Sequence, residues 1–321
     1  MNSADWDVFN GDADGLCSLV QLRLAEPRDS RLITGVKRDI DLLRQVDAQA
    51  GDRVTVLDIS LDKNRRDLQR ILDIGAQVLY VDHHYAGEMP NSASMMSLIN
   101  ETPDVCTSLL VNQYLRGSHA RWAVVGAFGD NLKTSAGKLA KKLSLSSNQL
   151  PMLEKLGILI NYNAYGANLQ DLHCAPSDLF KQLVIYADPL AFIADSREQY
   201  QQLEDGYYSD LQRAAAAQTV VVNNSVAAYL LPDEPWARRI SGVYGNQLAN
   251  ANPDRGHAVL TTKPSGDFSV SVRAPLNNKR NAGKLCRQFS TGGGREAAAG
   301  IDHLPAQQLQ AFLEIFEQAY K

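Results

Sequence analysis

Four short segments of the sequence place an acidic or histidine side chain directly after an apolar run. They are Asp12 and Asp14 in FNGDADG, Asp58 after VTVL, Asp82-His83-His84 after VLYV, and Asp130 after AFG. If these runs belong to one parallel sheet, their carboxyl ends meet at one edge, where open α/β sheets bind ligands. We therefore expect at least three of the four segments to face one crevice.

Carboxylates gathered in one crevice repel one another and require cations. Two divalent ions would supply four positive charges. Oxygen ligands with one or two imidazoles suit Mn²⁺ or Mg²⁺ better than a soft metal. Two such ions about 3.5–4 Å apart can hold the attacking and leaving oxygens of a displacement at phosphorus. The cluster therefore predicts metal-assisted hydrolysis of a phosphate ester.

Taken singly, most of these motifs have a simpler interpretation. The Asp12-x-Asp14-Gly15 sequence is also common in turns, Asp58 could cap a helix, and Asp130 could lie in a turn at a helix end. The Asp82-His83-His84 run is different, because packing does not explain three successive residues that can all bind a ligand. The four motifs together, in this order, favour the metal site.

A second cluster, near the carboxyl end, is basic. Residues 273–295 contain no acid and six basic side chains: Arg273, Lys279, Arg280, Lys284, Arg287 and Arg295. Within this stretch, the backbone N–H groups of Gly292-Gly293-Gly294 could bind an anion, more strongly if a helix follows them. A solvated basic surface with a flexible loop is the alternative. We expect an anion site, with the substrate in a cleft between it and the metal residues.

The elements that position these residues change character along the chain. The first part alternates buried strands with amphipathic helices, which predicts an α/β fold with a doubly wound, mostly parallel sheet. The expected strands lie near 6–9, 32–36, 54–57 and 78–81, and the expected helices near 15–26, 40–49 and 62–74. Residues 104–194 have a mostly helical pattern.

A polar stretch, expected to be an exposed helix or a linker, separates this part from a second, smaller domain. We predict a catalytic domain at 1–195, a linker at 196–217 and an α+β domain at 218–321. The expected strands of the second domain lie near 219–222, 226–230 and 268–273, and its helices near 234–251, 281–289 and 306–319. Net charge is −7 for residues 1–214 and +3 for 215–321, which suggests that one part holds cations and the other an anion.

The composition excludes several classes of protein. The 321 residues are 45% hydrophobic and 21% charged, as in globular proteins. The four cysteines form no CxxC pair, so neither a zinc knuckle nor a disulfide framework is indicated. No apolar run reaches the ~20 residues that span a bilayer, and the amino terminus lacks the features of a secretory signal. We expect a cytoplasmic protein without a membrane partner.

On these motifs the sequence resembles the DHH phosphoesterase superfamily, in the short two-domain form of its nanoRNase-like and RecJ-like members. The acidic segments match the four metal motifs of that superfamily, and GGGREAAAG at 292–300 is similar to the GGGHxxAAG signature of its DHHA1 domain. The resemblance covers nearly the whole chain. It implies a hydrolase with two Mn²⁺ ions, Mg²⁺ or Co²⁺ being alternatives, that binds nucleic acids or nucleotides.

The resemblance also implies roles for individual residues. Asp58 would bridge both ions, and Asp12 would bind one of them. The second ion would be bound by Asp14, His83 and Asp130. His84 would lie beside the scissile phosphate, and His84 and Asp58 would be the catalytic residues. The expected substrate-binding residues are Arg273, Lys284, Gly292, Gly293, Gly294 and Arg295.

The sequence departs from the family pattern around the first metal and in the second signature. NanoRNase-like members have a histidine where this chain has Val8, and RecJ-like members have an aspartate where it has Asn10. Asn10 is either a neutral oxygen ligand or leaves the first ion to be completed by water. Arg295 replaces the usual histidine of the glycine signature. Arginine binds phosphate through its planar, two-pronged guanidinium but does not transfer protons. We therefore predict that Arg295 binds an anion.

The leading function is hydrolysis of a phosphodiester in a short oligonucleotide or small dinucleotide, with release of a mononucleotide. A phosphatase acting on pyrophosphate, polyphosphate or a phosphorylated nucleotide is the alternative enzyme. Family II pyrophosphatases share the acidic motifs, but their second domain lacks the triple glycine. A catalytically weak nucleotide sensor is the alternative from another class. The sequence leaves the oligomeric state open, a homodimer included.

Overall fold

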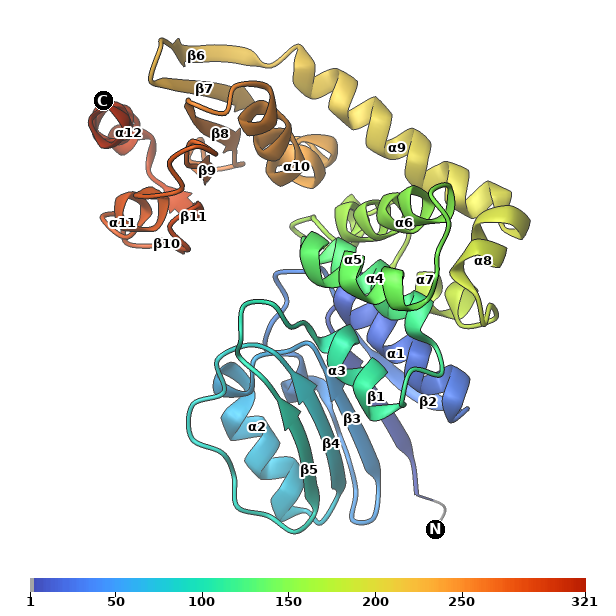
Figure 1. Cartoon of the computed structure of the whole chain (residues 1–321). Coiled ribbons are helices and arrows are strands. Elements are labelled where there is room, and N and C mark those ends of the chain that lie inside the picture. Colours follow the sequence, from blue (N-terminus) through green and yellow to red (C-terminus); the bar gives the residue numbers. More distant parts are fainter. Residues whose placement is uncertain (1–2) are drawn as a thin grey trace. The chain divides into compact units, whose positions relative to one another are not determined.

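The computed structural model describes residues 3–321, and the chain divides into two compact units, Met1–Glu204 and Asp205–Lys321. Figure 1 labels the elements of both. The strands of the first unit are β1 (Asp5–Phe9), β2 (Ser30–Ile33), β3 (Arg53–Leu57), β4 (Gln77–Asp82) and β5 (Met95–Ile99). Its helices are α1 (Ala13–Ala25), α2 (Leu61–Asp73), α3 (Thr107–Tyr114), α4 (Ala120–Gly129), α5 (Lys133–Lys142), α6 (Gln149–Asn163), α7 (Pro176–Leu183) and α8 (Pro189–Asp195), with the 3₁₀ turns η1 (Leu42–Gln45) and η2 (Leu169–Asp171).

The sheet of the first unit is entirely parallel, in the order β2-β1-β3-β4-β5. Alternate side chains of β1, β3 and β4 pack with η1 and α2 on one face, where Val8, Val56 and Tyr80 are fully buried. Helix α1 packs on the other face, so the helices lie on opposite sides of the sheet (Figure 1). The doubly wound α/β fold predicted from the sequence is confirmed.

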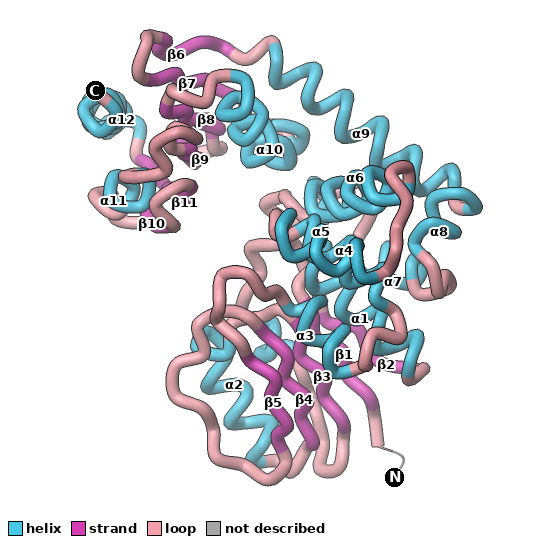
Figure 2. Tube along the Cα trace, in the orientation of Figure 1, coloured by secondary structure: helices cyan, strands magenta, loops and turns pink. Residues whose placement is uncertain are grey.

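Helix α1 is enclosed on all sides. Every residue from Ala13 to Arg23 is buried, because the sheet covers one side of the helix while α3 and α4 cover the others. Figure 2 shows the run of helices that follows β5. By contrast, α2 turns only Leu61, Leu68, Ile71 and Leu72, along with Asn64, toward the core. The motif at the start of α1 is therefore held inside the protein rather than on a surface loop.

The prediction of a helix near residues 40–49 is wrong, since only the short turn η1 forms there. Side chains of α2 bind the backbone of this segment instead: Asn64 accepts from the Leu43 N–H at 3.2 Å, and Arg70 donates to the Leu43 and Val46 carbonyls at 3.1 and 3.0 Å. These contacts satisfy backbone groups that a helix would otherwise pair. The apolar residues Leu42 and Ala48 still reach the core.

A buried ion pair joins α1 to the sheet. Arg23 donates to both oxygens of Asp7, at 2.8 and 2.7 Å, and to the Thr55 hydroxyl at 3.0 Å. The side chains of Arg23 and Asp7 are 5% and 0% exposed. Removing one partner leaves the other charge buried without compensation, which costs more than the pair contributes.

We therefore expect Arg23→Met to lower the free energy of unfolding by about 3–5 kcal/mol. Urea denaturation measures this change. The control is Arg53→Met, because Arg53 pairs with Asp5 on the surface and exposed pairs contribute about 0–1 kcal/mol. Equal, small effects of both variants would contradict this role of Arg23.

The second unit holds a six-stranded mixed sheet in the order β10-β11-β9-β8-β7-β6. Its strands are β6 (Gln218–Val222), β7 (Val226–Leu231), β8 (Gly256–Thr262), β9 (Phe268–Arg273), β10 (Gly292–Gly294) and β11 (Ala298–Leu304). Its helices are α10 (Pro235–Ala251), α11 (Ala282–Cys286) and α12 (Leu309–Tyr320), with the 3₁₀ turn η3 (Ala306–Gln308). Phe312 and Phe316 of α12 are fully buried against one face of the sheet, and α10 packs on β8 and β9. The smaller α+β domain is confirmed.

The polar stretch predicted as a linker forms a helix, α9 (Arg197–Ala215), which continues from the first unit into the second. Among residues 3–321, none of the helices combines the length and hydropathy needed to cross a membrane.

Candidate metal centre

The loop between β1 and α1 is shaped by close backbone contacts. A side chain at Gly11 would lie 2.0 Å from the Gly35 carbonyl oxygen, and one at Gly15 would lie 2.2 Å from the Asn10 carbonyl oxygen. Asp12 caps α1, because its Oδ1 accepts from the N–H groups of Asp14 and Gly15 at 3.0 and 3.1 Å. The glycines of this motif therefore allow the two aspartates to lie at the start of a buried helix.

Asp14 is fixed by the start of α3. Its Oδ2 accepts from the Thr107 N–H at 2.7 Å and its Oδ1 from the Ser108 N–H at 2.8 Å. These N–H groups lack partners within α3, and a carboxylate at a helix amino terminus is favoured by the helix dipole. Neither Thr107 nor Ser108 was predicted from the sequence as part of the site.

Asp58 follows β3 in a left-handed backbone conformation, with φ of 60°. Its N–H donates to the Val81 carbonyl of β4 at 3.0 Å, and its Oδ1 accepts from the Thr107 hydroxyl at 3.0 Å. Only 2% of Asp58 is exposed. A non-glycine residue held in this conformation is strained, and such strain is frequent at functional sites.

The two histidines after β4 are oriented by different partners. His83 Nδ1 lies 2.9 Å from the Val105 carbonyl oxygen. Because a carbonyl only accepts, Nδ1 carries the proton and donates it. His84 Nδ1 lies 2.8 Å from Asp82 Oδ1, and its side chain is 46% exposed. Asp82 is fully buried, so His84 stands between an interior acid and solvent.

Asp130 follows α4 rather than a strand. Its N–H donates to the Gly126 carbonyl at 2.9 Å at the end of that helix. The preceding Gly129 is required by packing, because a side chain there would lie 2.2 Å from the Ala13 side chain of α1. The close approach of α4 to α1 brings Asp130 to the Asp12–Asp14 motif.

His83 Nε2 is the point at which these carboxylates converge. It lies 3.5 Å from Asp58 Oδ1, 3.8 Å from Asp130 Oδ2 and 3.9 Å from Asp14 Oδ2. These separations are longer than hydrogen bonds. Asp58, His83 and His84 also each bring a ligand atom within 4.8 Å of the others. Side chains from four distant segments thus surround one small volume.

The electrostatics of the cluster reflect this crowding. Burial, followed by the neighbouring Asp14, Asp12, Asp82 and Asp130 carboxylates, raises the pKa of Asp58 well above its usual range. Burial and the Asp14 carboxylate raise the pKa of Asp130 to about 6. Both carboxylates are therefore unfavourable as anions unless a cation lies among them.

The residues of this cluster fit a divalent cation. With Nδ1 donating to the Val105 carbonyl, His83 presents Nε2 to three carboxylate oxygens, and a divalent cation could take all four groups as ligands. Three carboxylates and one imidazole, with no thiolate, suit a hard ion such as Mn²⁺. Asp14, Asp58, His83 and Asp130 are the residues that would hold it.

Asp12 has a different neighbour, which the sequence did not reveal. Lys37, in the loop after β2, donates from Nζ to Asp12 Oδ2 at 2.5 Å and to Asn161 Oδ1 at 3.2 Å. Burial raises the pKa of Asp12, but the attraction of Lys37 outweighs it and lowers that pKa below its ordinary value. Asn10 lies beside this pair: its Oδ1 accepts from the Asp12 N–H at 3.1 Å.

Comparison with known proteins identifies the fold. No protein-family model and no curated protein matches the sequence. A RecJ exonuclease structure with bound manganese aligns over 98% of this chain and 89% of its own length, with a TM-score of 0.62 and 17% identity. The chain has the DHH-type fold.

Two further structures share the DHH fold with this chain. A pGpG-specific phosphodiesterase, PggH, from Vibrio cholerae aligns over 98% of both chains, with a TM-score of 0.56 and 12% identity. An exopolyphosphatase-related protein from Bacteroides fragilis aligns over 99% of this chain and 91% of its own, with a TM-score of 0.53 and 13% identity. A shared fold at this level of identity does not fix an activity, which depends on the residues of the site.

In the second unit of the DHH fold, the predicted anion residues lie in two different settings. Arg273 is held by its own unit, donating to the Asn246 side chain at 2.5 Å, the Ser271 hydroxyl at 2.9 Å and the Gly242 carbonyl at 3.1 Å. Arg295 and Lys284 are exposed, and neither side chain has a hydrogen-bond or ion-pair partner among residues 3–321. Arg295 and Lys284 are therefore better placed than Arg273 to meet an anion.

The triple glycine forms β10 and is followed by strand β11, so no helix amino terminus adds to its anion binding. Packing explains two of the three glycines. A side chain at Gly292 would lie 1.7 Å from the Cys286 carbonyl oxygen, and Gly294 has a φ of 128° that favours glycine. Gly293 faces open space within 4 Å. Anion binding by Gly293 and its neighbours stays a prediction.

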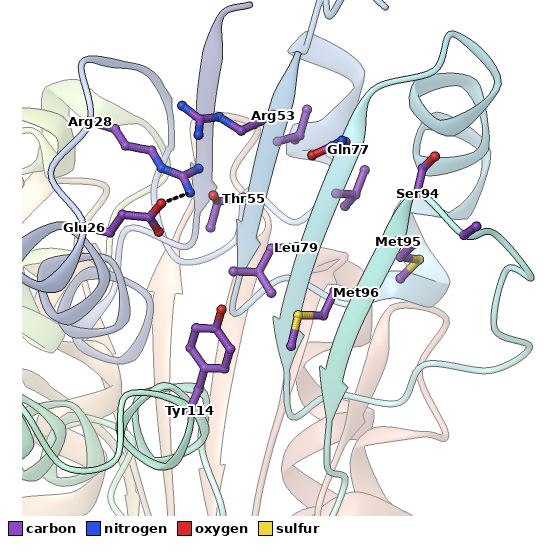
Figure 3. A pocket seen from close by; sticks show the side chains of 13 residues that line it. Glu26, Arg28, Arg53, Thr55, Gln77, Leu79, Ser94, Met95, Met96 and Tyr114 are labelled. Atoms are coloured by element: carbon purple, nitrogen blue, oxygen red, sulfur yellow. Dashed lines mark hydrogen bonds and ion pairs between the residues drawn. The ribbon is translucent and has the colours of Figure 1, made fainter. Parts of the chain in front are cut away.

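A pocket of about 420 Å³ lies elsewhere on the first unit (Figure 3). It is lined by the first residues of β3, β4 and β5 and by the open face of the sheet, where Leu79, Met96 and Tyr114 approach one another. None of the predicted site residues lines it. Because the acidic cluster follows the carboxyl ends of these strands, this pocket is separate from the candidate metal centre.

Proposed function

We propose that the chain is a metal-dependent phosphoesterase that hydrolyses phosphodiester bonds of short oligonucleotides or small dinucleotides and releases mononucleotides. The observation that carries this proposal is the convergence of Asp14, Asp58 and Asp130 on His83 Nε2, within 3.9 Å. Such a cluster is costly to build without a cation, and a hard cation beside water suits displacement at phosphorus.

Mn²⁺ is the proposed ion, with Mg²⁺ and Co²⁺ as alternatives. A divalent ion at this position supplies positive charge that activates water and stabilises the charge developing on the phosphate. The protein contributes rigid ligands. Asp14 is fixed by two N–H groups of α3, and His83 by the Val105 carbonyl. Pre-organised ligands avoid reorganisation during the reaction.

His84 is the proposed contact to the scissile phosphate. Its bond to Asp82 fixes the ring, and burial of Asp82 keeps that acid from moving away. Burial of the ring lowers the pKa of His84, but the Asp82 hydrogen bond and charge outweigh this effect and raise it above its ordinary value. A proton retained on Nε2 would be donated to a phosphate oxygen, where negative charge increases during hydrolysis.

The substrate class rests on the second unit and on the relatives in structure. Residues 215–321 have an excess of basic residues, and Arg295 and Lys284 are exposed there without side-chain partners among residues 3–321. We propose that these side chains bind a phosphate remote from the scissile bond. That PggH acts on a linear dinucleotide supports a nucleotide substrate. The exopolyphosphatase-related structure favours a second candidate, a phosphatase acting on pyrophosphate or polyphosphate.

Incubation of the purified protein with Mn²⁺ and separate substrates tests these candidates. Linear dinucleotides, short oligonucleotides, cyclic dinucleotides and pyrophosphate are each followed by chromatography. We expect mononucleotides from linear dinucleotides and short oligonucleotides. Release of inorganic phosphate from pyrophosphate alone would favour the phosphatase. Nucleotide binding without any turnover would instead indicate a sensor.

Arg295→Ala is expected to weaken the reaction in a manner that depends on substrate length. A charge-assisted contact contributes about 1.5–3 kcal/mol, so kcat/KM for a dinucleotide should fall roughly ten- to a hundred-fold, mainly through KM. A small activated ester, too short to meet Arg295, should change little. Arg295→Lys should restore little, because a point charge does not reproduce the planar fork.

The control for Arg295 is Arg280→Ala, since Arg280 is another exposed arginine of the same unit without a side-chain partner among residues 3–321. We expect Arg280→Ala to change kcat/KM by less than about twofold, as expected for a solvated surface charge. Equal losses on the long and the short substrate would mean that Arg295 serves the fold and not the substrate.

A further inference from the structure

The side chain of Lys37 lies beside Asp12, where the first of the two expected metal ions would bind. We propose that the Lys37 ammonium is the permanent cation at this position, so that the chain binds one divalent ion instead of two, at Asp14, Asp58, His83 and Asp130. This inference deepens the proposed function, because it takes the metal centre described above as its starting point. It replaces the pair of ions expected from the sequence by one ion and one lysine.

The contacts of Asp12 leave it no unused oxygen. Oδ1 accepts from the two N–H groups that begin α1, at 3.0 and 3.1 Å, and Oδ2 accepts from Lys37 Nζ at 2.5 Å. The Asp12 side chain is 4% exposed, and that of Lys37 is 27% exposed. A metal ion on Oδ2 would have to share that oxygen with the ammonium group, and two cations that close repel strongly in a partly buried site.

The backbone of Lys37 is fixed at both of its polar groups. Its N–H donates to the Ala164 carbonyl at 3.0 Å, and its carbonyl accepts from Asn10 Nδ2 at 3.4 Å. The loop approaches the motif closely, since a side chain at Gly11 would lie 2.0 Å from the Gly35 carbonyl oxygen. Lys37 therefore lies on a loop whose backbone is fixed next to Asp12, unlike a surface lysine on a solvated segment.

Val8 and Asn10, the two positions where the sequence departs from the family pattern, offer no free ligand atom to an ion beside Asp12 in the described structure. Val8 is apolar and fully buried within β1, paired in register with Val56 and Ile33. Both polar groups of the Asn10 side chain already bind backbone, the oxygen at the Asp12 N–H and the nitrogen at the Lys37 carbonyl. Among residues 3–321, this leaves Asp12 and the neighbouring Asp58 from the ligands expected for the first ion, and Asp12 is paired with Lys37.

The Lys37 ammonium also has a donor left for the substrate. Of the three N–H donors of the ammonium, two are used by Asp12 and Asn161, so the third can be donated to a substrate phosphate oxygen.

Metal content of the full-length protein tests the inference independently of activity. Metal-free protein is saturated with Mn²⁺, freed of excess ion, and measured by elemental analysis and electron paramagnetic resonance. We expect one ion per chain and the spectrum of an isolated Mn²⁺. Two ions per chain with a spin-coupled spectrum would overturn the inference. Binding of no ion would contradict the proposed function itself, which keeps the two failures distinct.

Substitutions locate the single ion. Asparagine caps helices as well as aspartate, so Asp12→Asn should keep the fold and bind one Mn²⁺ with an affinity within about threefold of the wild type. Asp14→Asn, the matched change at a proposed ligand, should lose at least tenfold in affinity. Equal losses in both variants would place Asp12 on the metal and overturn the assignment of Lys37.

A double-mutant cycle between Lys37 and Asp12 tests the pairing without any metal. Lys37→Met should lower the melting temperature of the metal-free protein, since it leaves Asp12 uncompensated, and adding Asp12→Asn should restore most of the loss. The control Lys63→Met removes an exposed lysine of α2 and should have little effect. Additive effects of Lys37→Met and Asp12→Asn would show that the two side chains do not compensate each other and would overturn the inference.

Discussion

The Asp58→Asn variant is expected to lose roughly 10³-fold or more in kcat/KM on a phosphodiester, together with most of its Mn²⁺ affinity. Asp58 lies 3.5 Å from His83 Nε2 and is oriented by the Thr107 hydroxyl, so it contributes a charge at the centre of the cluster. Asparagine keeps the shape and tolerates the left-handed backbone at this position. The loss should therefore come from the missing charge. Steady-state kinetics and Mn²⁺ titration measure it.

Stability measurements separate this loss from misfolding. Without a cation the carboxylates repel one another, so metal-free Asp58→Asn should melt at a higher temperature than the metal-free wild type. Asp47→Asn is the matched control, because Asp47 is an exposed acid of the same unit. It should change neither kinetics nor melting. An Asp58→Asn protein that keeps full activity with Mn²⁺ would contradict the proposed metal centre.

His84→Ala is expected to reduce kcat by about 10²–10³-fold, the effect of losing one donor to the charge of a transition state. His84 is half exposed and oriented by Asp82 at 2.8 Å, unlike the enclosed His83. We therefore expect Mn²⁺ affinity to change by less than about threefold, well below the roughly 10–100-fold typical of residues that hydrogen-bond to metal ligands. Kinetics and metal titration of the same variant measure both quantities.

Two further variants test the role of His84. His84→Asn retains a donor for Asp82 but no outward ring nitrogen, so it should lose as much activity as His84→Ala. His303→Ala removes a partly exposed histidine that pairs with Asp267 in the second unit, and it should behave as the wild type. Loss of the metal ion in His84→Ala would instead make His84 a ligand, in agreement with its closeness to Asp58 and His83.

The sequence predicted the first unit well because its strands are short, apolar and followed directly by the residues of the cluster. The strands around Val8, Val56 and Tyr80 are buried on both faces, which gives continuous apolar runs. The parallel arrangement then brings Asp12, Asp14 and Asp58 to one edge. Asp130 reaches the same point from a helix end, where the apolar run AFG had indicated only a buried segment.

Lys37 could not be predicted, because its partner Asp12 lies 25 residues away and no local pattern marks the loop between them. In the sequence, only Val8 and Asn10, where relatives have a histidine or an aspartate, indicated that the binding position of the first metal ion is unusual. Thr107 and Ser108 act through backbone N–H groups, which the sequence shows only as a helix start. In the second unit, the glycines of β10 were interpreted as an anion loop, but Gly292 is explained by its close approach to the end of α11.

The strands β5 and β8 were also missed. In β5, Met95 and Met96 are neither β-branched nor aromatic, and only one side of the strand pairs with the sheet. In β8, only Ala258, Val259 and Leu260 form an apolar run, preceded by Gly256 and His257 and followed by two threonines, although His257 is 1% exposed. Its pairing with β7 on one side and β9 on the other buries the whole strand. These two strands therefore form because of tertiary packing, although their local sequence pattern indicates a strand only weakly.

Turnover of a small chromogenic phosphodiester tests the central claim most directly. The wild-type protein is assayed after exhaustive chelation and again after addition of Mn²⁺, with metal analysis of both samples. We predict no turnover by the metal-free protein and recovery with Mn²⁺, because the carboxylates around His83 are arranged to hold a cation beside the phosphate. Full turnover by protein shown to be free of metal, or none by the Mn²⁺ form on any phosphate ester, would contradict a metal-dependent phosphoesterase.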